Sequence, residues 1–206
     1  MLSVFRAWGQ GDLSPTFLIF LCLGGKSMER GEKELVEIRA LLVETVRRYE
    51  ELVRLGIETD EPFKKTVAWQ MEDIAEDYIF DSMFKTGVFG GVHYDYFEKS
   101  VCRGVTDEKG KHFNVTFDIF LHSTTAACII EVKYNARKDD VLDLVNVKVE
   151  WFKRFFPQYA GYELYLGLGA LSFEKGVEAE AKAYGIGLLK VNGDAVEIDD
   201  VNLTAY

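Results

Sequence analysis

The amino-acid sequence predicts an α/β fold in which helices flank a mixed β-sheet core, with a helical arm at the N-terminus. Two segments, 29–55 and 62–85, carry apolar residues at helical spacing. The central segment 115–134, VTFDIFLHSTTAACIIEVKY, holds two runs rich in β-branched and aromatic residues on either side of a polar break. Helix and strand patterns then alternate to the C-terminus. This order of elements predicts a sheet with helices on both faces.

Length and composition indicate one globular domain with an appendage. The chain has 206 residues, of which 48% are hydrophobic and 28% charged, enough to bury a sizeable core. The net charge of −10 is unfavourable for a phosphate-binding surface. Within 107–160, however, eight Lys and Arg residues balance eight Asp and Glu residues. The three cysteines are odd in number and lack metal-ligand spacing, which predicts a reduced, cytoplasmic protein.

Residues 1–27 differ in character from the rest of the chain. Their apolar run, FLIFLCL, is too short to span a bilayer. Arg6 precedes the run as in a signal peptide, but Asp12 and the lack of a small-residue cleavage site argue against one. We expect this segment to be disordered or an upstream extension, with Met28 as an alternative start to Met1, and we expect no membrane association.

Residues 28–60 are expected to form a helix, 29–55, followed by a linker that begins after Gly56. Five apolar or aromatic residues and Thr45 in this helix follow a heptad pattern with steps of three and four: Leu35, Ile38, Leu42, Thr45, Tyr49 and Leu52. The pattern lasts under three heptads, so two interpretations stay open. The helix packs on its own domain, or it is a self-association arm that makes the chain a homodimer.

The main domain, 61–206, is expected to open with helix 62–85, because Pro62 suits a first helical turn. Glu72 and Glu76 lie one turn apart on a shared face of this helix. They are either a solvated acidic face or part of a site. A strand over 92–101 and a turn at 107–111 then lead to the central segment.

The central segment is expected to form a β-hairpin about Thr124-Thr125, in which paired residues have numbers that sum to 249. One face of this hairpin is wholly apolar and contains Phe117, Ile119, Leu121, Cys128, Ile130 and Val132. On the other face Asp118 lies opposite Glu131, and Thr116 lies opposite Lys133. Directly opposed β-carbons are roughly 5 Å apart. A one-residue slip would bury the charges, so the hydrophobic pattern fixes the register.

Two carboxylates this close repel each other unless a cation or a shared proton lies between them. Mg²⁺, with Mn²⁺ as a substitute, is a hard cation that prefers oxygen ligands. Lys133 would lie near such an ion, where it could orient a water or neutralise developing negative charge. The alternative interpretation is a structural hairpin with one Glu–Lys pair and a solvated Asp118.

After the hairpin, a helix is expected from a cap at Asp139 or Asp140 to Phe156, just before Pro157. Its buried stripe would consist of Leu142, Val145, Val149, Phe152 and Phe156. Strand 162–171, helix 173–184 and a hairpin over 188–198 about Asn192-Gly193 complete the chain. The sequence shows no phosphate-binding loop, zinc spacing or Ser-His-Asp set.

Asp118, followed on the next strand by Glu131-Val132-Lys133, resembles the signature of the PD-(D/E)XK nuclease superfamily. The run IIEVKY is similar to the second half of that motif in uncharacterised bacterial members, and the resemblance extends over about 69–198. Phe117 stands where the name-giving proline would be, but that proline is often absent in the superfamily. The run IAEDYIF resembles an Ala-Glu-Glu-aromatic stretch of the bacterial relatives, and it aligns Glu76 with a further carboxylate; Glu72 is the second choice.

The resemblance implies a restriction-endonuclease-like fold and a metal-dependent nuclease that hydrolyses phosphodiester bonds of DNA or RNA, with DNA favoured as partner. Asp118, Glu131 and Glu76 would then ligate Mg²⁺, and Lys133 would position the attacking water. Arg137, Lys138 and Lys148 are the nearest basic residues that could contact phosphates. The alternative is a non-catalytic interaction or assembly module with a nuclease fold, which the net charge of −10 favours. The intact Asp, Glu and Lys set favours the enzyme.

Overall fold

The computed structural model describes residues 61–106, 110–193 and 195–206, together with 41, 44, 45, 47, 48 and 51. The chain divides into two compact units, 1–45 and 46–206. The predictions for residues 1–27 lie outside the described residues, as does the heptad pattern of helix 29–55 apart from Thr45, which is helical and exposed. None of the helices in the described ranges is long and apolar enough to cross a membrane.

The described elements follow one another in an order close to the prediction. They are α3 (Glu61–Thr86), β1 (Val88–Phe89), β2 (Val92–His93), β3 (Tyr96–Thr106), β4 (His112–His122), β5 (Ala126–Ala136), α4 (Lys138–Asp143), the π-helical turn η1 (Leu144–Lys148), α5 (Val149–Phe155), the 3₁₀ turn η2 (Pro157–Tyr159), β6 (Glu163–Phe173), α6 (Val177–Ala183), β7 (Gly187–Asn192) and β8 (Ala195–Asp199). The elements α4, η1 and α5 are consecutive and form one interrupted helix.

Strands β3 to β8 form a mixed sheet in sequence order, as far as the chain is described. The pairs β3–β4, β4–β5 and β7–β8 are antiparallel, whereas β6 runs parallel to both β5 and β7. The two parallel pairings require crossover connections. The interrupted helix makes the first crossover and α6 makes the second. The prediction of a mixed α/β architecture is therefore confirmed.

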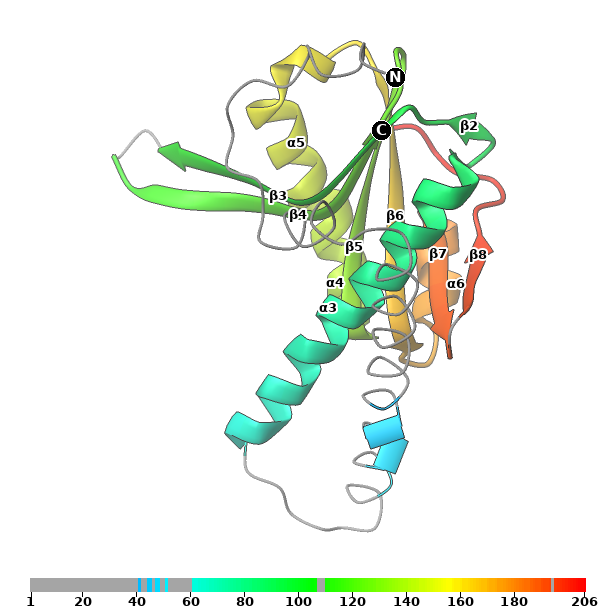
Figure 1. Cartoon of the computed structure of the whole chain (residues 1–206). Helices are drawn as coiled ribbons and strands as arrows, with labels where there is room; N and C mark the ends of the chain where they lie inside the picture. Colours follow the sequence, from blue (N-terminus) through cyan, green and yellow to red (C-terminus); the bar gives the residue numbers. More distant parts are fainter. Residues whose placement is uncertain are drawn as a thin grey trace, which may run out of the picture. The chain divides into compact units, whose positions relative to one another are not determined.

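Helices cover both faces of the sheet, as Figure 1 shows, and each face has its own apolar core. Helix α3 packs on one face through Ala75, Ile79 and Met83. The interrupted helix and α6 pack on the other face. Gly169 of β6 lies directly beneath Ile79, where a Cβ atom would collide with the Ile79 side chain. The glycine in this strand therefore lets α3 approach the sheet closely.

The predicted register of the β4–β5 hairpin is confirmed, because Ile119 pairs with Ile130 and Leu121 with Cys128. These four side chains lie in the core beneath α3. The placement of Phe117 on the same face is wrong. Its ring lies 6.0 Å from that of Phe152 and 5.5 Å from that of Phe156, on the opposite face. The strand changes face between Phe117 and Ile119, at the point where its pairing with β5 ends.

The predicted buried stripe of the third helix is right except at Leu142. Val149, Phe152 and Phe156 are buried as expected and Val145 packs partly buried against the core, but Leu142 is 37% exposed. Val141, Leu144 and Lys148 are buried as well, and of these only Leu144 was expected beside the stripe. The reason is the π-helical turn, in which the Val149 N–H donates to the Leu144 carbonyl five residues earlier. The extra residue in this turn rotates the first half of the helix relative to a regular α-helix.

Candidate active site

Strands β4 and β5 separate at Asp118. Their pairing runs from His122–Ala127 to Ile119–Ile130, and β4 then leaves with β3 as a two-stranded ribbon (Figure 1). Beyond this point the Val132 N–H donates to Asp118 Oδ2 at 2.7 Å. The Asp118 carboxylate thus accepts a hydrogen bond from a backbone N–H of β5 just beyond the last β4–β5 residue pair. The separation brings Asp118 into the gap between the two strands that carry the candidate site.

Ser100 on β3 lies across from Asp118, between the pairs Lys99–Ile119 and Val101–Phe117. Its φ of 49° is a left-handed conformation that costs a non-glycine residue about 1–3 kcal/mol. The Ser100 hydroxyl donates to Glu76 Oε1 at 3.2 Å. A strained backbone therefore lies at the strand separation and contacts a predicted site residue.

Glu131 is 5% exposed and lies between two lysines. Its Oε1 atom accepts a hydrogen bond from Lys148 Nζ at 2.7 Å, and its Oε2 atom is 3.8 Å from Lys133 Nζ. Burial and the nearby charge of Asp118 raise the pKa of Glu131 to about 7, although both lysines lower it. Burial, with the charge of Asp118, therefore favours the protonated form of the Glu131 carboxyl, and a bound cation would favour the ionised form instead.

Lys133 remains an ammonium at neutral pH. Burial lowers its pKa, but the carboxylates of Asp118, Glu131 and Glu72 outweigh this effect and hold the pKa above its usual value. Its Nζ donates to the Val132 carbonyl at 3.1 Å. A permanently charged lysine cannot act as a general base, but it can hold a water molecule and stabilise an anion.

Helix α3 brings Glu72 and Glu76 to the same region. Glu72 Oε1 accepts the Tyr134 N–H at 3.0 Å and so ties the helix to β5. Glu76 is 3.7 Å from Lys99 Nζ through its Oε1 atom. Burial raises the pKa of Glu76, Lys99 opposes this, and the charge of Asp118 raises it further. The structure thus brings Glu76 within the electrostatic influence of Asp118, whereas Glu72 has a structural contact of its own.

The described residues contain no group of three or more His, Cys, Asp or Glu side chains placed to hold a metal ion. Each candidate carboxylate has its own hydrogen-bond partner: Val132 N–H for Asp118, Lys148 for Glu131 and Ser100 for Glu76. Mg²⁺ in phosphoryl-transfer sites is held by one or two carboxylates together with water and substrate phosphates. The oxygen donors of Asp118 and Glu131 fit that chemistry.

Lys148 is the site residue whose contact the sequence reasoning missed, since it was expected only as one of three phosphate-binding residues. The sequence does contain a signal for its burial. Lys148 comes seven residues after Val141 and four after Leu144, which places it on an otherwise apolar helix face. The other two residues expected to contact phosphates, Arg137 and Lys138, form ion pairs outside the candidate site. Arg137 Nε is 3.2 Å from Glu174 and Lys138 Nζ is 2.9 Å from Glu180, both at the surface.

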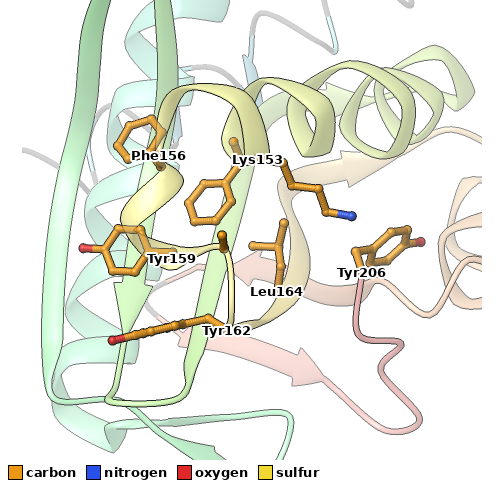
Figure 2. A pocket seen from close by; sticks show the side chains of 8 residues that line it. Lys153, Phe156, Tyr159, Tyr162, Leu164 and Tyr206 are labelled. Carbon is orange, nitrogen blue, oxygen red and sulfur yellow. The ribbon is translucent and has the colours of Figure 1, made fainter.

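A cavity of about 290 Å³ lies at the C-terminal end of α5, apart from the carboxylates. Figure 2 shows its largely aromatic lining, which consists of Phe152, Lys153, Phe156, Tyr159, Ala160, Tyr162, Leu164 and Tyr206. The ring of the lining residue Phe156 contacts the Phe117 ring, and Lys148 Nζ lies 5.5 Å from the centre of the Phe117 ring. The cavity therefore belongs to the aromatic core beside the candidate site and not to the site itself.

Comparisons with known proteins give no family assignment. A scan against protein-family models finds no match, and searches of curated proteins and of solved structures find no significant match.

Proposed function

We propose that the protein is a metal-dependent nuclease that hydrolyses phosphodiester bonds, with DNA preferred to RNA. The observation that supports this proposal is the gathering of Asp118, Glu131 and Lys133 where β4 separates from β5. The proposal also draws on the resemblance of these residues to the PD-(D/E)XK signature.

In this proposal Asp118 and Glu131 hold Mg²⁺, and Glu76 adds negative charge from α3. The bound ion would polarise the phosphate and lower the pKa of a water molecule. Lys133 orients that water and stabilises the charge that develops on the phosphate. Burial of Glu131 limits water around the carboxylates, which strengthens their interaction with a cation.

The competing proposal is a non-catalytic module with the same fold. The contacts of Glu131 favour it, because Lys148 and Lys133 supply part of the counter-charge within the protein. The net charge of −10 favours it as well, since nucleic-acid binding needs positive surface.

The test combines metal binding with cleavage. Millimolar Mn²⁺ should raise the melting temperature of the protein, because an ion that binds only the folded state stabilises it. Mg²⁺ or Mn²⁺ should support cleavage of single- or double-stranded DNA or RNA. Ca²⁺ should bind without supporting cleavage, because it takes more ligands in looser geometry.

A matched control is Glu150→Gln, which removes an exposed carboxylate of α5 outside the site. This variant should keep both the Mn²⁺ response and the cleavage. A parent protein that shows no melting shift with Mn²⁺ and no cleavage with any of these metals would favour the module.

A further inference from the structure

Lys148 is an unusual lysine because its side chain is only 11% exposed. Its ammonium makes two short contacts, to the Thr116 carbonyl at 2.7 Å and to Glu131 Oε1 at 2.7 Å. Thr116 belongs to β4 and Glu131 to β5, so one side chain bridges the two strands where they have separated. The same gap contains Asp118, two residues after Thr116 in the chain.

The helix around Lys148 departs from regular geometry in a way that keeps this lysine in place. Lys148 ends the π-helical turn η1, and Val149 directly after it is buried in the apolar core with Phe152. Successive residues of an α-helix point about 100° apart, so two neighbours do not share the centre of one buried face. The extra residue of the π turn places both on the inner side. Such turns occur frequently at functional sites.

We propose that Lys148 is a positioning residue of the metal centre, which holds Glu131 through Oε1 and leaves Oε2 on the side of Lys133. This inference rests on the proposed nuclease function and adds a residue to it. A group that hydrogen-bonds a ligating carboxylate fixes the orientation of that carboxylate, and its loss typically lowers metal affinity about 10–100-fold. Because Lys148 is also bonded to the Thr116 carbonyl, it fixes Glu131 relative to the strand that carries Asp118.

The simpler alternative is that Lys148 only neutralises a buried carboxylate. The two roles predict opposite effects on cation binding at a pH well above the pKa of Glu131, where this carboxylate stays ionised even without the lysine that lowers its pKa. Under that condition, removal of a positive charge next to the site should strengthen Mn²⁺ binding if the lysine is only a counter-charge. Removal of a positioning contact should weaken it.

The experiment measures Mn²⁺ affinity by isothermal titration calorimetry, with circular dichroism to show that each variant is folded. Lys148→Met, which keeps the length of the side chain without charge or donor, should weaken Mn²⁺ binding about 10–100-fold. Lys148→Arg should recover most of the affinity, because a guanidinium can donate to both the Thr116 carbonyl oxygen and Glu131 Oε1. Lys153→Met removes an exposed charge from the same helix and should leave the affinity unchanged.

If Lys148→Met does not fold, Lys148→Leu provides the same test of sign, because its side chain also lacks both the charge and the donor. Unchanged or tighter Mn²⁺ binding by the folded variant overturns the positioning role and leaves the proposed nuclease function standing. No Mn²⁺ binding by the parent overturns the proposed function and this inference together. Weaker binding by Lys148→Met or Lys148→Leu, with recovery by Lys148→Arg, supports the inference.

Discussion

Glu131 is the residue on which the charges of the candidate site converge. Lys148 and Lys133 contact its two oxygens, and Asp118 lies close enough to raise its pKa. Removal of one partner from a buried ion pair leaves the other charge uncompensated. Substitutions around Glu131 should therefore change stability and metal binding together, and only a comparison of both measurements separates the two effects.

The first prediction concerns pH. The pKa of Glu131 is about 7 in the folded protein, against 4.5 for an ordinary glutamate. Because the folded value is the higher one, its contribution to stability is present below about pH 4.5 and is lost as the pH rises through about 7. The free energy of unfolding of the parent minus that of Glu131→Gln should fall by on the order of 3 kcal/mol over this window.

This difference is measured by urea unfolding at a series of pH values with a chelator present. The charged groups that face Glu131 are Asp118, Lys133 and Lys148. Glu150→Gln serves as the control, and its difference from the parent should stay constant over the same window. A flat difference for Glu131→Gln would show that the carboxyl group titrates alike in the folded and unfolded states.

The second prediction concerns Asp118→Asn. This change removes the repulsion between two carboxylates but keeps an oxygen that can accept the Val132 N–H. The metal-free variant should melt at the same temperature as the parent or higher, and its stabilisation by Mn²⁺ should be smaller. Differential scanning calorimetry with chelator and with Mn²⁺ measures both. A metal-free variant that melts clearly lower would mean that the negative charge of Asp118 stabilises the strand separation.

The candidate site could be predicted from the sequence only in part. The placement of Glu131 and Lys133 on one face of β5 follows from the period of two along the strand, which is a local property. The β4–β5 pairing ends at Ile119–Ile130, so the expected pairing of Asp118 with Glu131 is not part of the ladder. The ion pair of Lys148 with Glu131 joins residues 17 positions apart through a helix that crosses back over the sheet. The burial of Lys148 in this helix depends on the π turn. The turn could not be predicted, because the apolar spacing of the helix fits an uninterrupted α-helix equally well.

At the scale of elements, the sequence predicted the order of strands and helices and the register of the β4–β5 hairpin. It did not predict that Phe117 turns to the opposite face, because the alternating pattern assumes that a strand stays paired. It also placed a helix from residue 173, whereas β6 extends to Phe173 and α6 begins at Val177. Gly176 precedes α6 with a φ of 89°, a conformation that favours glycine.

The third prediction tests how α3 is held against the sheet. Gly169→Ala should lower the free energy of unfolding by about 1–3 kcal/mol, because the new methyl group collides with Ile79 of α3. Gly161→Ala is the matched control, since a Cβ atom there meets no atom within 4 Å, and it should change stability by about 0.5 kcal/mol at most. Urea unfolding measures both. Equal effects of the two substitutions would contradict the close approach of α3 to β6.

At the scale of the whole molecule, the heptad pattern in the sequence of 29–55 predicts a homodimer if this segment is a self-association arm and not a helix packed on its own domain. Light scattering on the full chain and on a chain that starts at Met28 should both give twice the mass of one chain. Replacement of Leu42 by Glu, in the middle of the pattern, should shift the mass toward that of a monomer, because a charge in an a/d seam disfavours association. If both unsubstituted chains are monomers at micromolar concentration, the segment 29–55 is not a self-association arm.

The proposed nuclease function requires the residues at the strand separation to catalyse phosphodiester hydrolysis, and the Lys133→Ala variant separates this role from metal binding. The ammonium of Lys133 does not coordinate a cation, so this variant should bind Mn²⁺ nearly as well as the parent by calorimetry. It should nevertheless lose cleavage of DNA in the presence of Mg²⁺ or Mn²⁺, because the water and the developing charge are no longer held. Cleavage by Lys133→Ala at the rate of the parent would rule out this role of Lys133, and no cleavage by the parent with any divalent ion would rule out the proposed nuclease function.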